Sequence, residues 1–94
     1  MFAGVAVMAE SSLPDLPLPP EKWRQLRQSL HLPRQQLRVV ELILRNCSDK
    51  QIAAEIGIAI PTVRTHLTRT FARLGVENRM GLVLKLFAAS HRLK

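Results

Sequence analysis

The stretch SDKQIAAEIGIAIPTVRTHLTRTFARLG, which runs from Ser48 to Gly75, decides the fold of this 94-residue chain. Its first four residues match a capping box, in which the serine oxygen accepts the N3 amide and the N3 side chain reaches back to the serine amide. A helix is therefore predicted from Asp49 to Ile56, and Gly57 ends it. Proline is typical of a first helical turn, so a second helix is predicted from Pro61 to Leu74, before Gly75.

The second predicted helix has two unlike faces. Its apolar face recurs at helical spacing and is typical of a side packed against a core. The residues of this face are Val63, Leu67, Thr70 and Leu74. The opposite face carries Thr65, Thr68 and Arg69, and the helix contains no acid. A helix, a short turn with glycine and a second helix with such a face form the layout of a helix-turn-helix, whose second helix enters the major groove of DNA.

Three more helices are predicted around this pair. The first spans Glu21 to Leu30, after two prolines. The second spans Arg34 to Arg45, and Asn46 follows it as a stop because asparagine tolerates the left-handed conformation. Its inner face consists of Leu37, Val40, Ile43 and Leu44. The last helix spans Asn78 to His91, with Asn78 as its N-cap. The sequence therefore predicts an all-α fold, a small helical bundle that contains a helix-turn-helix and has an extra N-terminal helix.

Residues 1–20 are predicted to be a flexible, proline-rich tail outside the core. Prolines at positions 14, 17, 19 and 20 remove backbone donors and favour an extended path. Residues 21–31 then form a brace helix, and residues 32–94 form the helix-turn-helix domain. The first nine residues are apolar, but they lack a basic start and are far shorter than the ~20 residues that cross a bilayer. Neither export nor a membrane contact is expected, and Met8 is a candidate second start of translation.

The composition narrows the class of partner and excludes several chemistries. Lysine and arginine number 14 against 7 acidic residues, for a net charge of +7, which favours a polyanionic partner. One cysteine, Cys47, rules out an internal disulfide and is expected to be a buried small hydrophobe. The histidines are too scattered for a zinc cluster. No nucleophile–base pair, paired carboxylates or phosphate-binding glycine loop is present, so no catalysis, metal, cofactor or small-molecule ligand is expected.

Several motifs follow one another at linked separations. They are Ser48-Asp-Lys-Gln-Ile-Ala53, Gly57-Ile58, Thr62-Val-Arg-Thr-His-Leu67, Leu74-Gly-Val76 and Asn78-Arg79. Together they resemble the LuxR/GerE-type four-helix DNA-binding domain, over about Leu32 to Phe87. The resemblance implies that Pro61–Leu74 is the recognition helix and that the last helix mediates homodimerisation. It also implies that the base contacts fall on Arg64, Thr65 and Thr68.

The side chains agree with these implied roles. Thr65 and Thr68 point away from the apolar face, and Arg64 can reach a guanine edge or a phosphate. Phosphate contacts position a protein without reading sequence, and the residues predicted to make them are Lys50, Thr62, His66, Arg69, Arg73 and Arg79. The last helix has more apolar surface than one side needs. The residues predicted to form its dimer interface are Leu82, Val83, Leu86 and Phe87. Packing of this surface against the helix that contains Trp23 is the alternative.

Four positions depart from the family pattern, and one of them is Asn46, which replaces a usual glycine and is tolerated because asparagine adopts the left-handed conformation. Gln36 stands where the family usually has glutamate and Arg38 where an acid is common, which puts an ion pair expected of the family in question. Ala59 occupies the usual serine or threonine cap before the recognition helix. Losing such a cap typically costs ~0.5–2 kcal/mol, and Pro61 is expected to compensate in part.

The leading functional hypothesis is a bacterial, cytoplasmic transcriptional regulator that binds double-stranded DNA sequence-specifically as a homodimer. The alternative is a module similar to sigma-factor region 4, which shares the helix-turn-helix. Such a module would bind RNA polymerase and have only weak DNA affinity of its own. Salt dependence separates the two hypotheses, since DNA affinity that rests on phosphate contacts falls steeply with salt.

Overall fold

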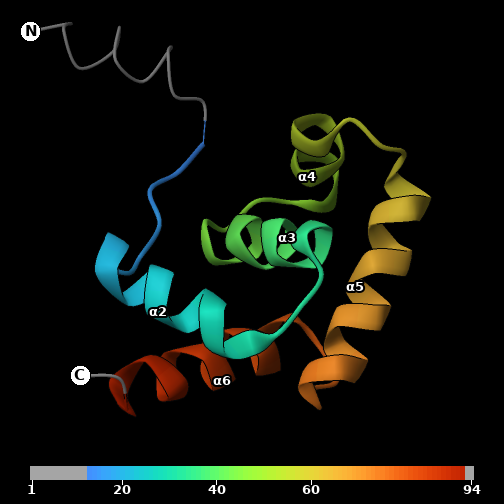
Figure 1. Cartoon of the computed structure of the whole chain (residues 1–94). Helices are drawn as coiled ribbons and strands as arrows, with labels where there is room; N and C mark the ends of the chain where they lie inside the picture. Colours follow the sequence, from blue (N-terminus) through green and yellow to red (C-terminus); the bar gives the residue numbers. More distant parts are fainter. Residues whose placement is uncertain (1–12, 93–94) are drawn as a thin grey trace, which may run out of the picture.

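The computed structural model describes residues 13–92, which form five α-helices and no strand (Figure 1). The helices are α2 (Pro20–Leu30), α3 (Arg34–Leu44), α4 (Asp49–Ile56), α5 (Ile60–Leu74) and α6 (Arg79–Arg92). The predicted all-α bundle is confirmed, and each helix begins and ends within one residue of its predicted bounds. The start of the predicted tail, with Met8, lies outside the described residues.

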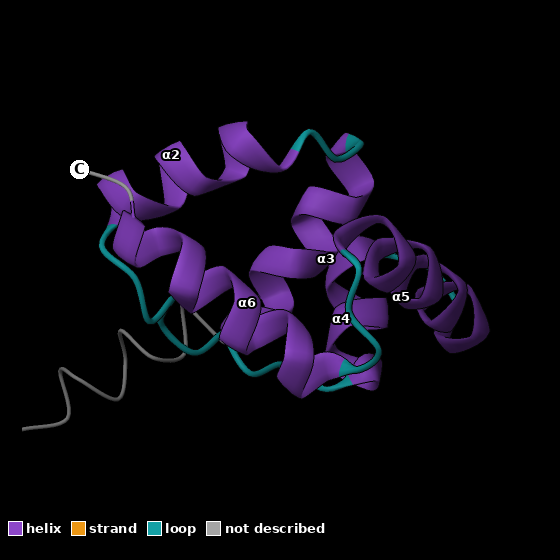
Figure 2. Ribbon diagram, turned by 90° about the horizontal axis from the view of Figure 1, so that it is seen from below, coloured by secondary structure: helices purple, strands orange, loops and turns teal. Residues whose placement is uncertain are grey.

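Helix α3 lies at the centre of the bundle (Figures 1 and 2). It contacts α5 on one side and α6 on another, while α4 packs on α5 and α2 packs on α6. This central position explains a difference from the predicted inner face. Val39 and Leu42 are completely buried as well, whereas Leu37 is only half-buried. A helix with neighbours on several sides buries more than the single face that a periodicity argument assigns to it.

Local signals set the helix boundaries as predicted. The capping box of α4 is complete: the Gln51 amide donates to Ser48 Oγ at 3.1 Å, and the Ser48 amide donates to Gln51 Oε1 at 2.8 Å. Gly57 follows α4 with φ +81°, and Asn46 follows α3 with φ +64°. Both are left-handed conformations, which glycine adopts freely and asparagine tolerates. The short connections that result bring α3, α4 and α5 together.

The N-terminal helix α2 covers α6, and this pairing removes Leu82 and Leu86 from the predicted dimer interface, whereas Val83 and Phe87 are half-buried. Trp23 and Leu26 of α2 belong to the core, as do Leu82 and Leu86 of α6, which are 0 % and 1 % exposed. Lys22 Nζ also donates to the Ser90 carbonyl at 3.2 Å. Leu82 and Leu86 are therefore core residues of a single chain and have no surface to offer a partner. Their apolar excess is buried by the Trp23 helix, which was the alternative interpretation.

The stretch before α2 is not separate from the core. Residues 13–19 contain no helix, as the prolines predict, but Leu13, Leu16 and Leu18 pack against the core cluster. Arg45 Nη1 also donates to the Pro14 carbonyl at 3.0 Å. The prediction that the tail reaches residue 20 and lies outside the core is therefore wrong for these positions. Leucines spaced between the prolines let an extended segment bury apolar surface without forming regular structure.

Arg38 and Cys47 have clear structural explanations. Arg38, at a position where the family commonly has an acid, pairs with Glu55 of α4 at 3.1 Å and with Glu41 at 3.3 Å. Cys47 is 2 % exposed, and burial raises the pKa of its thiol, so it is the small buried hydrophobe that was predicted. None of the helices between residues 13 and 92 has both the length and the apolar character needed to cross a bilayer.

Candidate nucleic-acid interface

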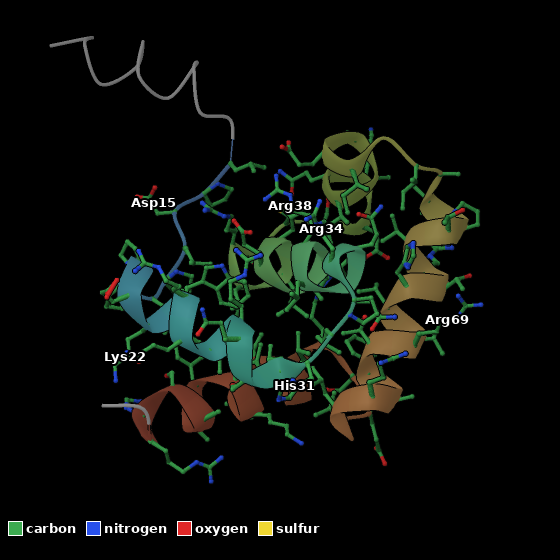
Figure 3. The ribbon with its side chains drawn as sticks, viewed as in Figure 1. Asp15, Lys22, His31, Arg34, Arg38 and Arg69 are labelled. Atoms are coloured by element: carbon green, nitrogen blue, oxygen red, sulfur yellow. The ribbon has the colours of Figure 1, made fainter. Side chains whose placement is uncertain are left out.

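The outward face of α5 is open to solvent along its length. Arg64, Thr65 and Thr68 are all exposed, while Val63, Thr70 and Leu74 are buried on the opposite side. Figure 3 shows Arg69 at the side of the molecule opposite to Asp15 and Lys22, so residues 13–19 and the start of α2 are remote from this face. The division of α5 into a core face and a free face is as predicted.

The two threonines of the free face have hydroxyl groups with a fixed role. Thr65 Oγ1 donates to the Pro61 carbonyl at 3.2 Å, and Thr68 Oγ1 donates to the Arg64 carbonyl at 3.0 Å. The hydroxyl hydrogens are therefore used inside the helix. What remains for a ligand is an oxygen that accepts and a methyl group. These are features that match a base amino group and a thymine methyl in the major groove.

One edge of α5 faces α4 through an arginine network. Arg64 Nε lies 3.7 Å from Asp49 Oδ2, at the first residue of α4, and the Arg64 side chain is 70 % exposed. Asp49 Oδ1 lies 3.4 Å from Arg79 Nη1 of α6. Because the contact uses Nε of Arg64, the two terminal nitrogens of that guanidinium remain available for a guanine edge.

Arg79 has a structural role that sequence reasoning missed. Besides Asp49, its guanidinium Nη2 donates to the Cys47 carbonyl at 2.8 Å, in the connection between α3 and α4. The side chain thus ties the first turn of α6 to the start of α4. Its hydrogen bonds do not support the predicted phosphate contact, and no local sequence signal distinguishes this arginine from a surface one.

The opposite edge of α5 carries four polar or basic side chains. Thr62, His66, Arg69 and Arg73 follow one another at helical spacing, and three of them are exposed while His66 is half-buried. Lys50 is exposed on α4.

The N-terminus of α5 lacks a side-chain cap. Ala59 is the N-cap and its side chain makes no hydrogen bond, yet few backbone N–H groups of the first turn are left without a partner. Pro61 has no N–H group, and the Thr62 amide donates to the Ala59 carbonyl at 3.0 Å, which is how the missing cap is tolerated.

A groove separates this second edge from the first turn of α3. Gln35 and Gln36 line one wall, and His66, Arg69 and Arg73 line the other. Gln36 is buried, although glutamine is polar and the periodicity of α3 assigned it no inner position. The one sequence feature that singled out this position is that it carries glutamine where the family usually has glutamate.

Two helices joined by a glycine turn, with a free polar face on the second helix, define a helix-turn-helix protein. Residues 30–86 match the family described as bacterial regulatory proteins of the luxR family. That match covers more than half of the chain, which therefore belongs to the luxR family of regulatory proteins, a DNA-binding and not an enzymatic family. Helix α2 lies almost wholly before the matched region.

Curated relatives agree with this assignment. The spore germination protein GerE of Bacillus subtilis is 31 % identical over 65 residues, which cover 69 % of this chain and 88 % of GerE. The HTH-type transcriptional regulator AlkS of Ectopseudomonas oleovorans is 38 % identical over 48 residues, or 51 % of this chain but 5 % of AlkS. The chain thus spans most of the small relative and only a small part of the large one. No solved structure matches the chain.

Proposed function

We propose that the protein is a sequence-specific regulator of transcription that inserts α5 into the major groove of double-stranded DNA and acts as a homodimer. The observation that carries the proposal is the free face of α5, where Arg64, Thr65 and Thr68 are exposed on a helix without an acid. Small side chains allow the helix to approach base edges closely, and the absence of acids removes repulsion from the phosphates.

Arg64, Thr65 and Thr68 read bases in this proposal. The free terminal nitrogens of Arg64 suit the O6 and N7 acceptors of guanine, which is the commonest specific contact of arginine. The threonine oxygens accept from base amino groups because their hydrogens are used inside the helix. The three residues therefore discriminate between base pairs rather than merely between charged and neutral surfaces.

The second edge of α5 contacts the sugar-phosphate backbone in this proposal. Thr62, His66, Arg69 and Arg73 run along one edge of the helix, so they follow one strand while the free face reads the bases. Lys50, exposed on α4, is a further backbone contact in this proposal. Arg79 is left out of this set because its guanidinium is occupied by Asp49 and Cys47.

The homodimer, in this proposal, uses an α6 surface centred on Met80 and Leu84 in place of the buried Leu82 and Leu86. The other two predicted residues, Val83 and Phe87, lie half-buried on the same side of the helix. Met80 and Leu84 lie one turn apart and are 65 % and 62 % exposed, unlike Leu82 and Leu86. Two large apolar residues exposed one turn apart on a helix form a patch that can pair with its own copy across a two-fold axis. Such a dimer would present two recognition helices to half-sites about 34–36 Å apart, if they are one DNA turn apart.

Selection of bound duplexes from a random-sequence pool tests the proposal directly. A palindromic motif is the expected result. Arg64→Ala should relax the preference at one position per half-site and weaken binding by about 1–3 kcal/mol, whereas Arg73→Ala should weaken all sequences alike. A pool that returns no preferred sequence for the unaltered protein would refute sequence-specific recognition, and equal losses on all sequences for both variants would refute the division of roles.

A further inference from the structure

The groove between α3 and α5 contains no acidic residue in its lining. Its walls are Gln35 and Gln36 from the first turn of α3 and His66, Arg69 and Arg73 from α5. Arg69 and Arg73 are one turn apart, and neither has an ion-pair or hydrogen-bond partner within residues 13–92. By contrast, Arg38, Arg45 and Arg79 all pair with carboxylates. The two groove arginines therefore leave positive charge uncompensated beside α3.

Two buried polar atoms at this groove have no hydrogen-bond partner. Gln36 is 7 % exposed, and its Oε1 is unpaired, as is Nδ1 of His66. Leaving a buried polar group unpaired is unfavourable, and an unpaired group of this kind in a native fold is a sign that a ligand or a water completes the site. A half-turn of the Gln36 amide exchanges its oxygen and nitrogen in place, so the same side chain can present an N–H donor to the groove.

The first turn of α3 adds backbone donors to the same place. Pro33 is the N-cap and offers no side-chain hydrogen bond, and the first turn contains no acid. The first helical bond runs from the Leu37 amide to the Pro33 carbonyl at 2.9 Å. The amides of Gln35 and Gln36 precede that bond, so they have no partner inside the helix. A free helix N-terminus attracts anions through its amides and its dipole.

We propose that this groove binds a phosphate group, and that the phosphate is one of the DNA backbone beside the major groove that α5 occupies. The α3 amides and the Gln36 side chain hold the phosphate oxygens from one wall. Arg69, Arg73 and His66 hold them from the other. This inference rests on the proposed function for the source of the phosphate, and it adds α3, which lies outside the helix-turn-helix, to the DNA-binding surface.

The nature of residue 36 makes the inference specific to this chain. A glutamate at that position, as the family usually has, would place a carboxylate among the two arginines and repel a phosphate. Gln36 has the same size without the charge, so the groove is free of acid. Gln36→Glu should therefore weaken DNA binding, whereas Gln36→Met, which is of similar size and neutral, should weaken it less.

The test is a titration of the ¹⁵N-labelled full chain, followed by NMR, with two probes used separately: a random-sequence duplex and inorganic phosphate. With the duplex, the backbone amides of Gln35 and Gln36 should shift together with those of Thr65 and Thr68. Arg69→Gln/Arg73→Gln should weaken the duplex about ten- to a hundredfold, because hydrogen bonds to charged groups are lost. The salt dependence of log K should also flatten by about 1 per protomer.

A matched control removes the same charge elsewhere. Arg24 and Arg27 of α2 line another groove, with Gln28 and Leu37, and α2 and α5 lie on opposite sides of α3 (Figure 1). Arg24→Gln/Arg27→Gln should leave the Gln35 and Gln36 shifts intact, and the affinity should change far less, since distant charges are screened beyond about 8–10 Å at ordinary ionic strength. An equal loss in both double variants would overturn the site, because net charge alone would then explain the effect.

The remaining outcomes separate this inference from the proposed function. Duplex-dependent shifts at Thr65 and Thr68 without shifts at Gln35 and Gln36 would overturn the groove and leave the function intact. Absence of any duplex binding would refute the proposed function and, with it, the DNA backbone as the source. If inorganic phosphate shifted the Gln35 and Gln36 amides to saturation but the duplex did not shift them, the assignment of the phosphate to DNA would be overturned as well. Retained duplex binding in Gln36→Glu, with the fold confirmed by its spectrum, would also count against the site.

Discussion

Truncation of Leu86 to alanine tests whether the inner face of α6 is the core of one chain or a surface between two. Leu86 is 1 % exposed and packs in the cluster that includes Trp23 and Leu26. Leu84 lies two residues earlier on the same helix and is 62 % exposed. The pair Leu86→Ala and Leu84→Ala thus makes the same chemical change on opposite sides of one helix.

The expected magnitudes differ widely between the two variants. Removing a buried leucine side chain loses its transfer free energy and leaves a cavity, which together cost about 3–5 kcal/mol. For a domain of this size, each kcal/mol lowers the unfolding midpoint by roughly 4–8 °C, so Leu86→Ala should lower it by at least about 12 °C. Leu84→Ala should change the free energy of unfolding by no more than about 0.5 kcal/mol, because the site is on the surface.

Thermal unfolding followed by circular dichroism measures the stability of each variant, and sedimentation equilibrium measures its monomer–dimer association. Both should be run at several protein concentrations, since dimerisation makes the midpoint depend on concentration. Leu84→Ala should shift the association equilibrium towards monomer at unchanged monomer stability. If Leu86→Ala instead left the midpoint of the dilute protein unchanged and abolished association, Leu86 would be an interface residue and the core assignment would be wrong.

Three further outcomes are expected. Asp49→Asn should reduce discrimination at the base pair that Arg64 is proposed to read, because the carboxylate that orients Arg64 Nε is lost. The affinity of this variant for random duplex should rise, because a negative charge near the DNA is removed. Selection from the random pool with this variant measures both effects. Ser48→Ala should lower the free energy of unfolding by about 1 kcal/mol through loss of the α4 cap, as measured by urea denaturation. Cys47 should react with iodoacetamide at pH 8 much more slowly in the folded than in the urea-unfolded chain, because burial raises the pKa of the thiol and the thiolate is the reactive form; equal rates would contradict its burial.

The parts of the fold that the sequence predicts are those set by neighbours in the chain. The capping box at Ser48, the left-handed residues Asn46 and Gly57, and the proline at position 61 each act within one helical turn, so the bounds of α4 and α5 follow from them. The free face of α5 is likewise a local matter, because the spacing of residues along one helix determines it.

The parts that were missed depend on what lies across space. The apolar residues of α6 show that it must be covered, but not whether α2 or a second chain covers it. In the sequence Arg79 cannot be told from a surface arginine. Its structural role comes from the hydrogen bond to the Cys47 carbonyl, which is distant in the chain. Gln36 is buried at the groove between α3 and α5, and the periodicity within α3 does not indicate that neighbour. Each of these errors concerns the identity of a packing neighbour, which is not encoded in a short stretch of sequence.

The pairing of α2 with α6 has a consequence for how the protein can be divided. The segment that matches the luxR family starts at residue 30, yet Trp23 and Leu26 fill the space over Leu82 and Leu86 from before that point. The hydrophobic core therefore extends beyond the segment that matches the family, because it includes residues of α2. A fragment trimmed at the edge of the family domain would keep every residue proposed to contact DNA and still expose the inner face of its last helix to water.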